Sequence, residues 1–158
     1  MNELGGYAFD DLRVGMWATF AKTITEADIV LFTAVSGDNN AIHINEEFAA
    51  STIFKGRIAH GMLSASVISA AIANKLPGPG SIYVSQSLRF RAPVRAHDTV
   101  RATVTVKEMI PVRSRALLAT VCTVGGLVVI EGEALVALPA PSPQYLSPVV
   151  FEKEAALA

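Results

Sequence analysis

The sequence predicts an α+β fold in which an antiparallel sheet wraps around one long central helix. The thirteen residues from Met62 to Asn74 carry no charge. Their apolar positions leave no broad polar face, so a helix formed there is buried nearly all round. Four strand-like runs follow this segment and can form an antiparallel sheet. A sheet that curls around the helix is the most economical way to bury it.

Length and composition indicate a single domain with part of its surface covered by another subunit. The chain has 158 residues, of which 17% are charged and 51% are hydrophobic, whereas ordinary soluble proteins have about 25% charged residues. A homodimer or a larger homo-oligomer would cover this surface and would also pair the open edge of a curled sheet. The net charge is −1 and there is no basic cluster, which argues against nucleic acid and anionic membranes as partners.

Nothing in the sequence predicts export or insertion into a membrane. The first residues lack the basic start and apolar core of a signal peptide, and the uncharged segment is too short to span a bilayer. We therefore expect a cytoplasmic protein. Cys122 is the sole cysteine, which excludes an internal disulfide and a cysteine-based metal knuckle.

The elements before the central helix are a strand at 17–24 and then a capped helix. Thr25 is a typical helix N-cap, with Asp28 placed to complete a capping box. The helix should end near Gly37, because glycine readily takes the left-handed conformation that terminates helices. This ending delivers Asp38 to a loop directly after the helix.

That loop is rich in small polar residues and carries His43 five positions after Asp38. Asn45 can cap a further short helix, since asparagine is a favoured N-cap residue. The central helix then opens at His60 and Gly61. An acidic residue and a histidine therefore lie close in sequence to the start of a buried helix, which is a plausible place for an active site.

The region after the central helix is predicted to be mainly strand. Pro77-Gly78-Pro79-Gly80 forms a firm stop and turn, and Gly125-Gly126 is a two-residue loop of the kind that closes a hairpin. Residues 1–138 are expected to form the folded domain, and the proline-rich residues 139–158 a C-terminal tail. The four predicted strands are 81–91, 98–108, 115–124 and 127–138.

Three blocks of this sequence resemble the MaoC-like (R)-specific enoyl-CoA hydratases. Residues 32–43, FTAVSGDNNAIH, are similar to the family signature of an aromatic residue, small residues and Gly-Asp-x-Asn-Pro-x-His. Residues 59–63, AHGML, resemble a second block, and 76–83 together with 88–90 resemble a third. The similarity extends over most of residues 7–138. It implies a hot-dog fold and the reversible addition of water across the 2,3-double bond of an enoyl-CoA.

The resemblance also implies roles for individual residues. Asp38 and His43 match the family's catalytic pair, and the amide of Gly61 matches its oxyanion donor. Ser69 matches a serine that lines the site, and Asn40, within the signature, is expected to make loop hydrogen bonds beside the substrate. An acyl-CoA is the implied partner, and neither a metal nor another cofactor is implied.

The chemistry of these residues supports the same roles. Hydration needs a base that activates water and a proton donor for C2, and Asp38 and His43 can hold one water from two sides. The enolate that develops on the thioester oxygen needs hydrogen-bond donors, and N–H groups at a helix start lack intrahelical partners. Glycine at position 61 lets a thioester approach closely. One such donor is worth about 3–4 kcal/mol in the transition state.

Two other functions are compatible with the sequence. A hot-dog acyl-CoA thioesterase would use the same helix terminus, but such enzymes generally place a carboxylate elsewhere, often on the long helix, which is uncharged here. A non-catalytic acyl-CoA-binding subunit is suggested by Ala41, which replaces the usual proline of the signature. His60 is expected to support the loop rather than to react.

Overall fold

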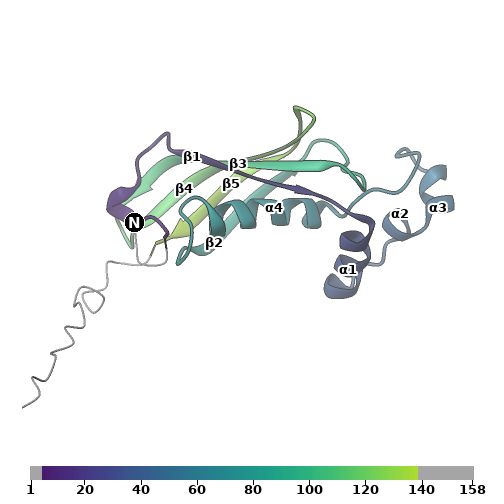
Figure 1. Cartoon of the computed structure of the whole chain (residues 1–158), viewed down its shortest axis with the longest axis horizontal. Coiled ribbons are helices and arrows are strands. Elements are labelled where there is room, and N and C mark those ends of the chain that lie inside the picture. The colour runs from purple at the N-terminus through teal and green to yellow at the C-terminus, as the bar shows by residue number, and fades with distance from the viewer. Residues whose placement is uncertain (1–4, 139–158) are drawn as a thin grey trace, which may run out of the picture.

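The computed structural model describes residues 5–138, which form a five-stranded antiparallel sheet curved around one long helix (Figure 1). This arrangement confirms the predicted fold class. The tail predicted at 139–158 lies outside the described residues. The elements in chain order are a 3₁₀ turn Phe9–Asp11, β1 Trp17–Thr23, α1 Glu26–Ser36, α2 Ala41–Ile44, α3 Glu46–Ser51, α4 Gly61–Asn74, β2 Ile82–Phe90, β3 Thr99–Ile110, β4 Arg115–Val124 and β5 Leu127–Ala137.

The strand order across the sheet is β1-β3-β4-β5-β2, so β1 and β2 are the two edge strands. The predicted hairpin joins β4 to β5 through Gly125 and Gly126. Both glycines have positive φ, 56° and 87°, which is the backbone conformation that a tight hairpin with the native strand twist requires. β2 follows α4 and joins the far side of β5 in antiparallel register. The chain thus wraps its sheet around the helix between β1 and β2.

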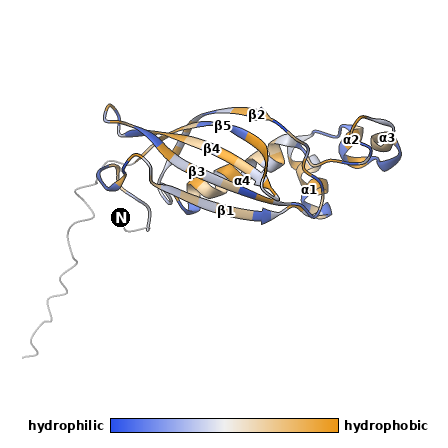
Figure 2. Ribbon diagram, turned by 90° about the horizontal axis from the view of Figure 1, so that it is seen from above, coloured by the Kyte–Doolittle hydropathy of each residue, from blue (hydrophilic) through white to orange (hydrophobic). Residues whose placement is uncertain are grey.

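The core lies between α4 and the concave face of the sheet. Alternate residues of β3 face it, and Val100, Ala102 and Val104 are completely buried, as the period-two pattern predicts. Val67 and Ile68 of α4 pack into the same cluster. Figure 2 shows hydrophobic residues along α4 and along β4, which crosses it. Within the described residues, no helix is long and apolar enough to cross a membrane.

The expectation that α4 is buried nearly all round is wrong for a single chain. The helix packs against β3, β1 and β4, which leaves one of its sides open. Met62 is 58% exposed, and Ser66 and Ser69 on the same helix are also exposed. The prediction fails because these positions are uncharged, and small or apolar side chains do not indicate which side of a helix is exposed to solvent.

The segment that carries α1, α2 and α3 projects beyond one end of the sheet, next to the N-terminus of α4 (Figure 1). Its start follows the predicted capping box. The Thr25 hydroxyl accepts from the Asp28 amide at 3.1 Å, and the Asp28 carboxylate accepts from the Thr25 amide at 2.8 Å. Gly37 ends α1 with φ of 76°, which confirms the predicted left-handed stop. This fixed start and end determine where the chain turns into Asp38.

Candidate active site

Asp38 and His43 reach the site on two different local structures. Asp38 follows the left-handed Gly37 in a loop, as predicted. His43, however, lies in the one-turn helix α2, where the sequence suggested a loop. Asn40 caps this helix, because its side-chain oxygen accepts from the Ile42 amide at 3.2 Å. A helix of four residues shows no hydrophobic periodicity, so the pattern could not reveal it.

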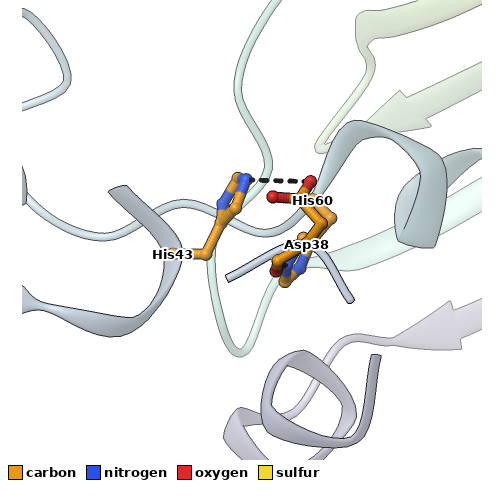
Figure 3. A group of neighbouring side chains, drawn as sticks. All are labelled: Asp38, His43 and His60. Carbon is orange, nitrogen blue, oxygen red and sulfur yellow. Dashed lines mark hydrogen bonds and ion pairs between the residues drawn. The ribbon is translucent and has the colours of Figure 1, made fainter. Parts of the chain in front are cut away.

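Asp38 and His43 face each other, as Figure 3 shows. The His43 Nε2 atom lies 4.0 Å from Oδ2 of Asp38, and the side chain of His43 is 8% exposed against 52% for Asp38. This distance is too long for a direct hydrogen bond. It is a separation that one water molecule can bridge by hydrogen-bonding to both side chains.

A backbone carbonyl sets the tautomer of His43. The Nδ1 atom of His43 lies 2.8 Å from the carbonyl oxygen of Ile58. A carbonyl oxygen can only accept, so Nδ1 carries the hydrogen and donates it. In the neutral imidazole, Nε2 then keeps a free lone pair that faces Asp38. The atom nearest the carboxylate is therefore the one able to take a proton from water.

His60 contacts both members of this pair. It is the N-cap residue of α4 and is 1% exposed. Its ring stacks on that of His43 with centroids 3.9 Å apart, and its Nε2 lies 2.9 Å from the backbone oxygen of Asp38, to which it donates. His60 thus holds the backbone of Asp38 in place, which agrees with the supporting role expected for it.

A cavity of about 500 Å³ opens beside the pair and brings Asp38, His43 and Gly61 together. Most of its other lining residues are apolar. The full lining is Asp38, Ile42, His43, Phe54, Ile58, Ala59, Gly61, Met62, Ser64, Phe90, Arg91, Ala92, Pro93, Val94 and Ile130. Three of the predicted site residues, from three separate segments, therefore share one apolar pocket.

The other two predicted site residues lie outside this lining. The side chain of Asn40 is exposed and caps α2. Ser69 is exposed on the open side of α4, two turns beyond Gly61. Their roles in substrate binding stay predictions.

The start of α4 presents free donors to the cavity. His60 makes no side-chain capping hydrogen bond, so the first amides of the helix, beginning with Gly61, have no partner within it. A Cβ atom at position 61 would lie 2.8 Å from the nearest ring carbon of Phe90. Glycine at this position lets the Phe90 ring lie directly against the start of α4, whereas a Cβ atom would force the ring to shift.

Sequence reasoning missed Phe90 and Ser64 as parts of the site. Phe90 ends β2 and covers the start of α4, although its chain neighbours gave no indication of this contact. Ser64 is buried, lines the cavity and donates to the His60 carbonyl at 3.3 Å. Its residue type alone does not indicate this position. The small side chain does keep that wall of the cavity free.

The ligand atoms of Asp38, His43 and His60 lie within 4.8 Å of one another, a spacing compatible with a metal ion. The two imidazoles, however, are stacked with only 30° between their planes. The Nδ1 atom of His43 and the Nε2 atom of His60 donate to the backbone oxygens of Ile58 and Asp38, so neither of these nitrogens offers a lone pair to a metal. The arrangement suits a water-binding pair better than a metal centre.

Most of this chain is similar in sequence to known proteins. Residues 15–126 match the family model described as a MaoC like domain. The chain belongs to the MaoC-like family. It is 57% identical over 132 residues to an (R)-specific enoyl-CoA hydratase of Rhodospirillum rubrum, covering 84% of this chain and 92% of that protein. It is 51% identical over 137 residues to a 3-hydroxybutyryl-CoA dehydratase of Methylorubrum extorquens, covering 87% of each.

Solved structures of the family show the same fold. The unliganded R-hydratase of Pseudomonas aeruginosa superposes with a TM-score of 0.80 at 45% identity, covering 85% of this chain and 87% of that one. The (R)-hydratase of Aeromonas caviae gives 0.78 at 42% identity, covering 81% and 98%. The sheet around a central helix is thus the hot-dog fold of the MaoC-like hydratases.

Proposed function

We propose that this protein is an (R)-specific enoyl-CoA hydratase, a hydro-lyase that interconverts 2-enoyl-CoA and (R)-3-hydroxyacyl-CoA. One observation carries the proposal. The Asp38 carboxylate and the free Nε2 of His43 lie 4.0 Å apart in a cavity that also contains the unpaired amide end of a helix at Gly61. The names of the similar hydratases and dehydratases from Rhodospirillum rubrum, Methylorubrum extorquens and Aeromonas caviae support it.

The geometry supports the following reaction. A water between the pair donates one hydrogen bond to the Asp38 carboxylate and the other to His43 Nε2. As the water oxygen bonds to C3, Nε2 takes its proton, and the electrons of the double bond move to the thioester oxygen. The imidazolium then returns the proton to C2 as the enolate collapses. One water is consumed, and its hydroxyl group and its proton add to the same face of the substrate.

The helix terminus stabilises the intermediate. The Gly61 N–H donates to the thioester oxygen, where negative charge develops, and the positive end of the α4 dipole favours that charge. Most of the remaining cavity lining is apolar, which reduces screening of this interaction by water. The same contact fixes the orientation of the acyl group over Asp38 and His43. The pair then attacks a single face, which the family resemblance assigns to the (R)-alcohol.

A crotonyl-CoA assay tests this function. Absorbance of the enoyl-thioester band should fall without release of free thiol, and chiral analysis should find (R)-3-hydroxybutyryl-CoA in large excess. Loss of the band with free thiol would show a thioesterase instead. A stable band with ligand bound would show a binding subunit. Residues Gly61–Asn74 of α4 include no carboxylate that could serve the thioesterase mechanism.

We also propose that residues 1–138 act as one catalytic domain and that the enzyme works as a cytoplasmic homodimer. Within residues 5–138, β2 has a free edge and is exposed along most of its length, and α4 leaves Met62 and Ser69 exposed. A second copy paired along β2 would cover both surfaces. Ser69 could then contact the acyl chain, because the partner would close the open side of the helix, while Asn40 would contact substrate at the cavity mouth.

A further inference from the structure

One guanidinium joins the segments that carry the site. Both terminal nitrogens of Arg57 contact the carboxylate of Glu26 in α1, with Nη1–Oε2 and Nη2–Oε1 distances of 3.0 and 3.1 Å. Its Nε atom donates to Glu46 of α3 at 3.1 Å. The arginine fork therefore bridges two helices that do not follow each other directly in the chain. A planar, multidentate arrangement of this kind fixes orientation as well as distance.

Each of the joined segments leads to a site residue. α1 runs through its left-handed Gly37 into Asp38. α3 begins directly after α2, which carries His43. Arg57 itself precedes Ile58, whose carbonyl accepts from His43 Nδ1 at 2.8 Å, and the same stretch of chain continues to Gly61. The guanidinium thus ties the first residue of α1, at the opposite end of that helix from Asp38, and the first residue of α3 to the segment that carries Ile58.

The backbone around Arg57 is secured from its other side. Arg95 donates to the Arg57 carbonyl at 3.0 Å and also to the carbonyl of Phe54. The Ile58 amide donates to the Ile42 carbonyl of α2 at 3.2 Å. With these contacts the Ile58 carbonyl has little freedom to turn away from His43.

This cluster lines a small polar cavity of about 230 Å³, behind the segment that walls the larger one. The cavity also contains Lys55 and His97, which could suggest an anion site. Glu26 and Glu46 line it as well, however, and already pair with Arg57. Both arginines of the cavity, Arg57 and Arg95, are engaged within the protein. The two carboxylates would also repel a phosphate, so the cluster serves to connect segments of the fold.

We propose that Arg57 is a positioning residue for the hydration reaction. By tying α1 and α3 to the segment that carries Ile58, it keeps the Ile58 carbonyl on His43 Nδ1 and so keeps Nε2 available as the base. The proposal rests on the proposed function for its kinetic consequence. Its structural consequence, a single tautomer of His43, is independent of the reaction.

The test compares Arg57→Gln and Arg57→Lys with Lys107→Gln as a matched control. Lys107 pairs with Glu133 on the sheet, away from the site. Arg57→Gln should lower kcat by about 10–100-fold, by analogy with the loss of residues that orient metal-bound histidines. The KM for crotonyl-CoA should change by less than about 3-fold. Lysine cannot bridge two carboxylates with a fork, so Arg57→Lys should recover only part of kcat. Lys107→Gln should match the wild type.

A second readout follows the tautomer directly in protein labelled with ¹⁵N-histidine, without substrate. The chain has three histidines, and a His43→Ala sample assigns the ring signals. Wild-type His43 should show a protonated Nδ1 and a free Nε2, and Arg57→Gln should show a mixture of tautomers. A wild-type kcat, or a reduced kcat with an unchanged His43 spectrum, would overturn the proposal. If Arg57→Gln fails to fold, Glu26→Gln and Glu46→Gln should show the same two changes, and their absence would overturn it equally.

The two readouts separate this proposal from the function. A wild-type protein without hydratase activity would refute the proposed function, and the spectrum of His43 would still decide the role of Arg57.

Discussion

The carbonyl oxygen of Ile58 accepts a hydrogen bond from Nδ1 of His43 at 2.8 Å, across fifteen positions of sequence. This contact decides which nitrogen of the imidazole faces Asp38. A histidine free to turn would present either nitrogen, and a protonated Nε2 could not accept a proton from water. The position of one backbone carbonyl therefore determines whether the pair can act as a base.

The first prediction concerns that pair. Asp38→Asn and His43→Ala should each lower turnover of crotonyl-CoA by at least about 10²-fold, the usual scale for a lost acid–base group. The fold should persist, because neither side chain belongs to the hydrophobic core between α4 and the sheet. Since the two residues hold one water as a unit, the double variant should be little worse than the poorer single variant. Steady-state kinetics and circular dichroism measure both effects, and near-native turnover in either single variant contradicts the assignment.

The second prediction concerns the pH dependence of stability at the start of α1. Hydrogen bonds from the Thr25 amide and hydroxyl lower the pKa of Asp28 below its ordinary value. A carboxylate with a depressed folded-state pKa stabilises the protein above its unfolded pKa of about 3.9 and loses that effect as pH falls through the folded value. Asp28→Asn should thus be less stable than the wild type at pH 7, and the difference should shrink near pH 3.

Urea unfolding at both pH values measures this difference, with Glu47→Gln as a control carboxylate on α3. Thr25→Ala removes the other half of the box and should cost about 1 kcal/mol at pH 7, as is typical of a lost N-cap. An Asp28→Asn deficit of equal size at both pH values would show that the carboxylate charge is not what stabilises the helix.

The third prediction concerns assembly. Sedimentation of the wild type should show a homodimer and no folded monomer at micromolar concentration. In the described part of the chain, β2 pairs with β5 alone, and Ile82 and Phe90 on it are 63% and 54% exposed. Val84→Lys places a charge on that strand, and lysine on an edge strand opposes pairing with another edge. This variant should dissociate or aggregate. A wild type that sediments as a stable monomer would mean that the edge is protected in another way.

The sequence predicted those features that depend on neighbouring residues. The capping box of Thr25 and Asp28, the stop at Gly37 and the hairpin at Gly125 each follow from the chemistry of residues a few positions apart. The pairing of Asp38 with His43 could be predicted for the same reason, since both lie within one twelve-residue signature.

Contacts between segments that are far apart in the chain could not be predicted from the sequence. No periodicity or composition in the sequence indicates the hydrogen bond between Ile58 and His43 or the bridge from Arg57 to Glu26. Both contacts form only when the whole domain packs. The ring of Phe90 over Gly61 is a further example. From the sequence, Gly61 predicts space for a thioester, whereas the structure shows that the Phe90 side chain of β2 fills part of that space.

The last prediction uses this contact to isolate the oxyanion donor. Any residue with a Cβ at position 61 meets the Phe90 ring at 2.8–3.1 Å, so Gly61→Pro alone would combine a steric clash with the loss of the N–H. The substitution should instead be made in a Phe90→Ala background, which removes the ring. Proline suits the first position of a helix, and His60 before it has ψ of 136°, which a residue preceding proline readily adopts.

In that background, Gly61→Ala keeps the N–H and adds only a methyl group, so its turnover of crotonyl-CoA should stay within a few-fold of Phe90→Ala. Gly61→Pro removes the N–H and should lose a further factor of about 10²–10³, the cost typical of one missing oxyanion donor. Circular dichroism checks that α4 is retained in both. Equal turnover in the alanine and proline variants would exclude the Gly61 amide as the donor. If both variants fall equally below the Phe90→Ala parent, position 61 requires glycine for space and not for its N–H, because only the proline variant lacks the hydrogen-bond donor.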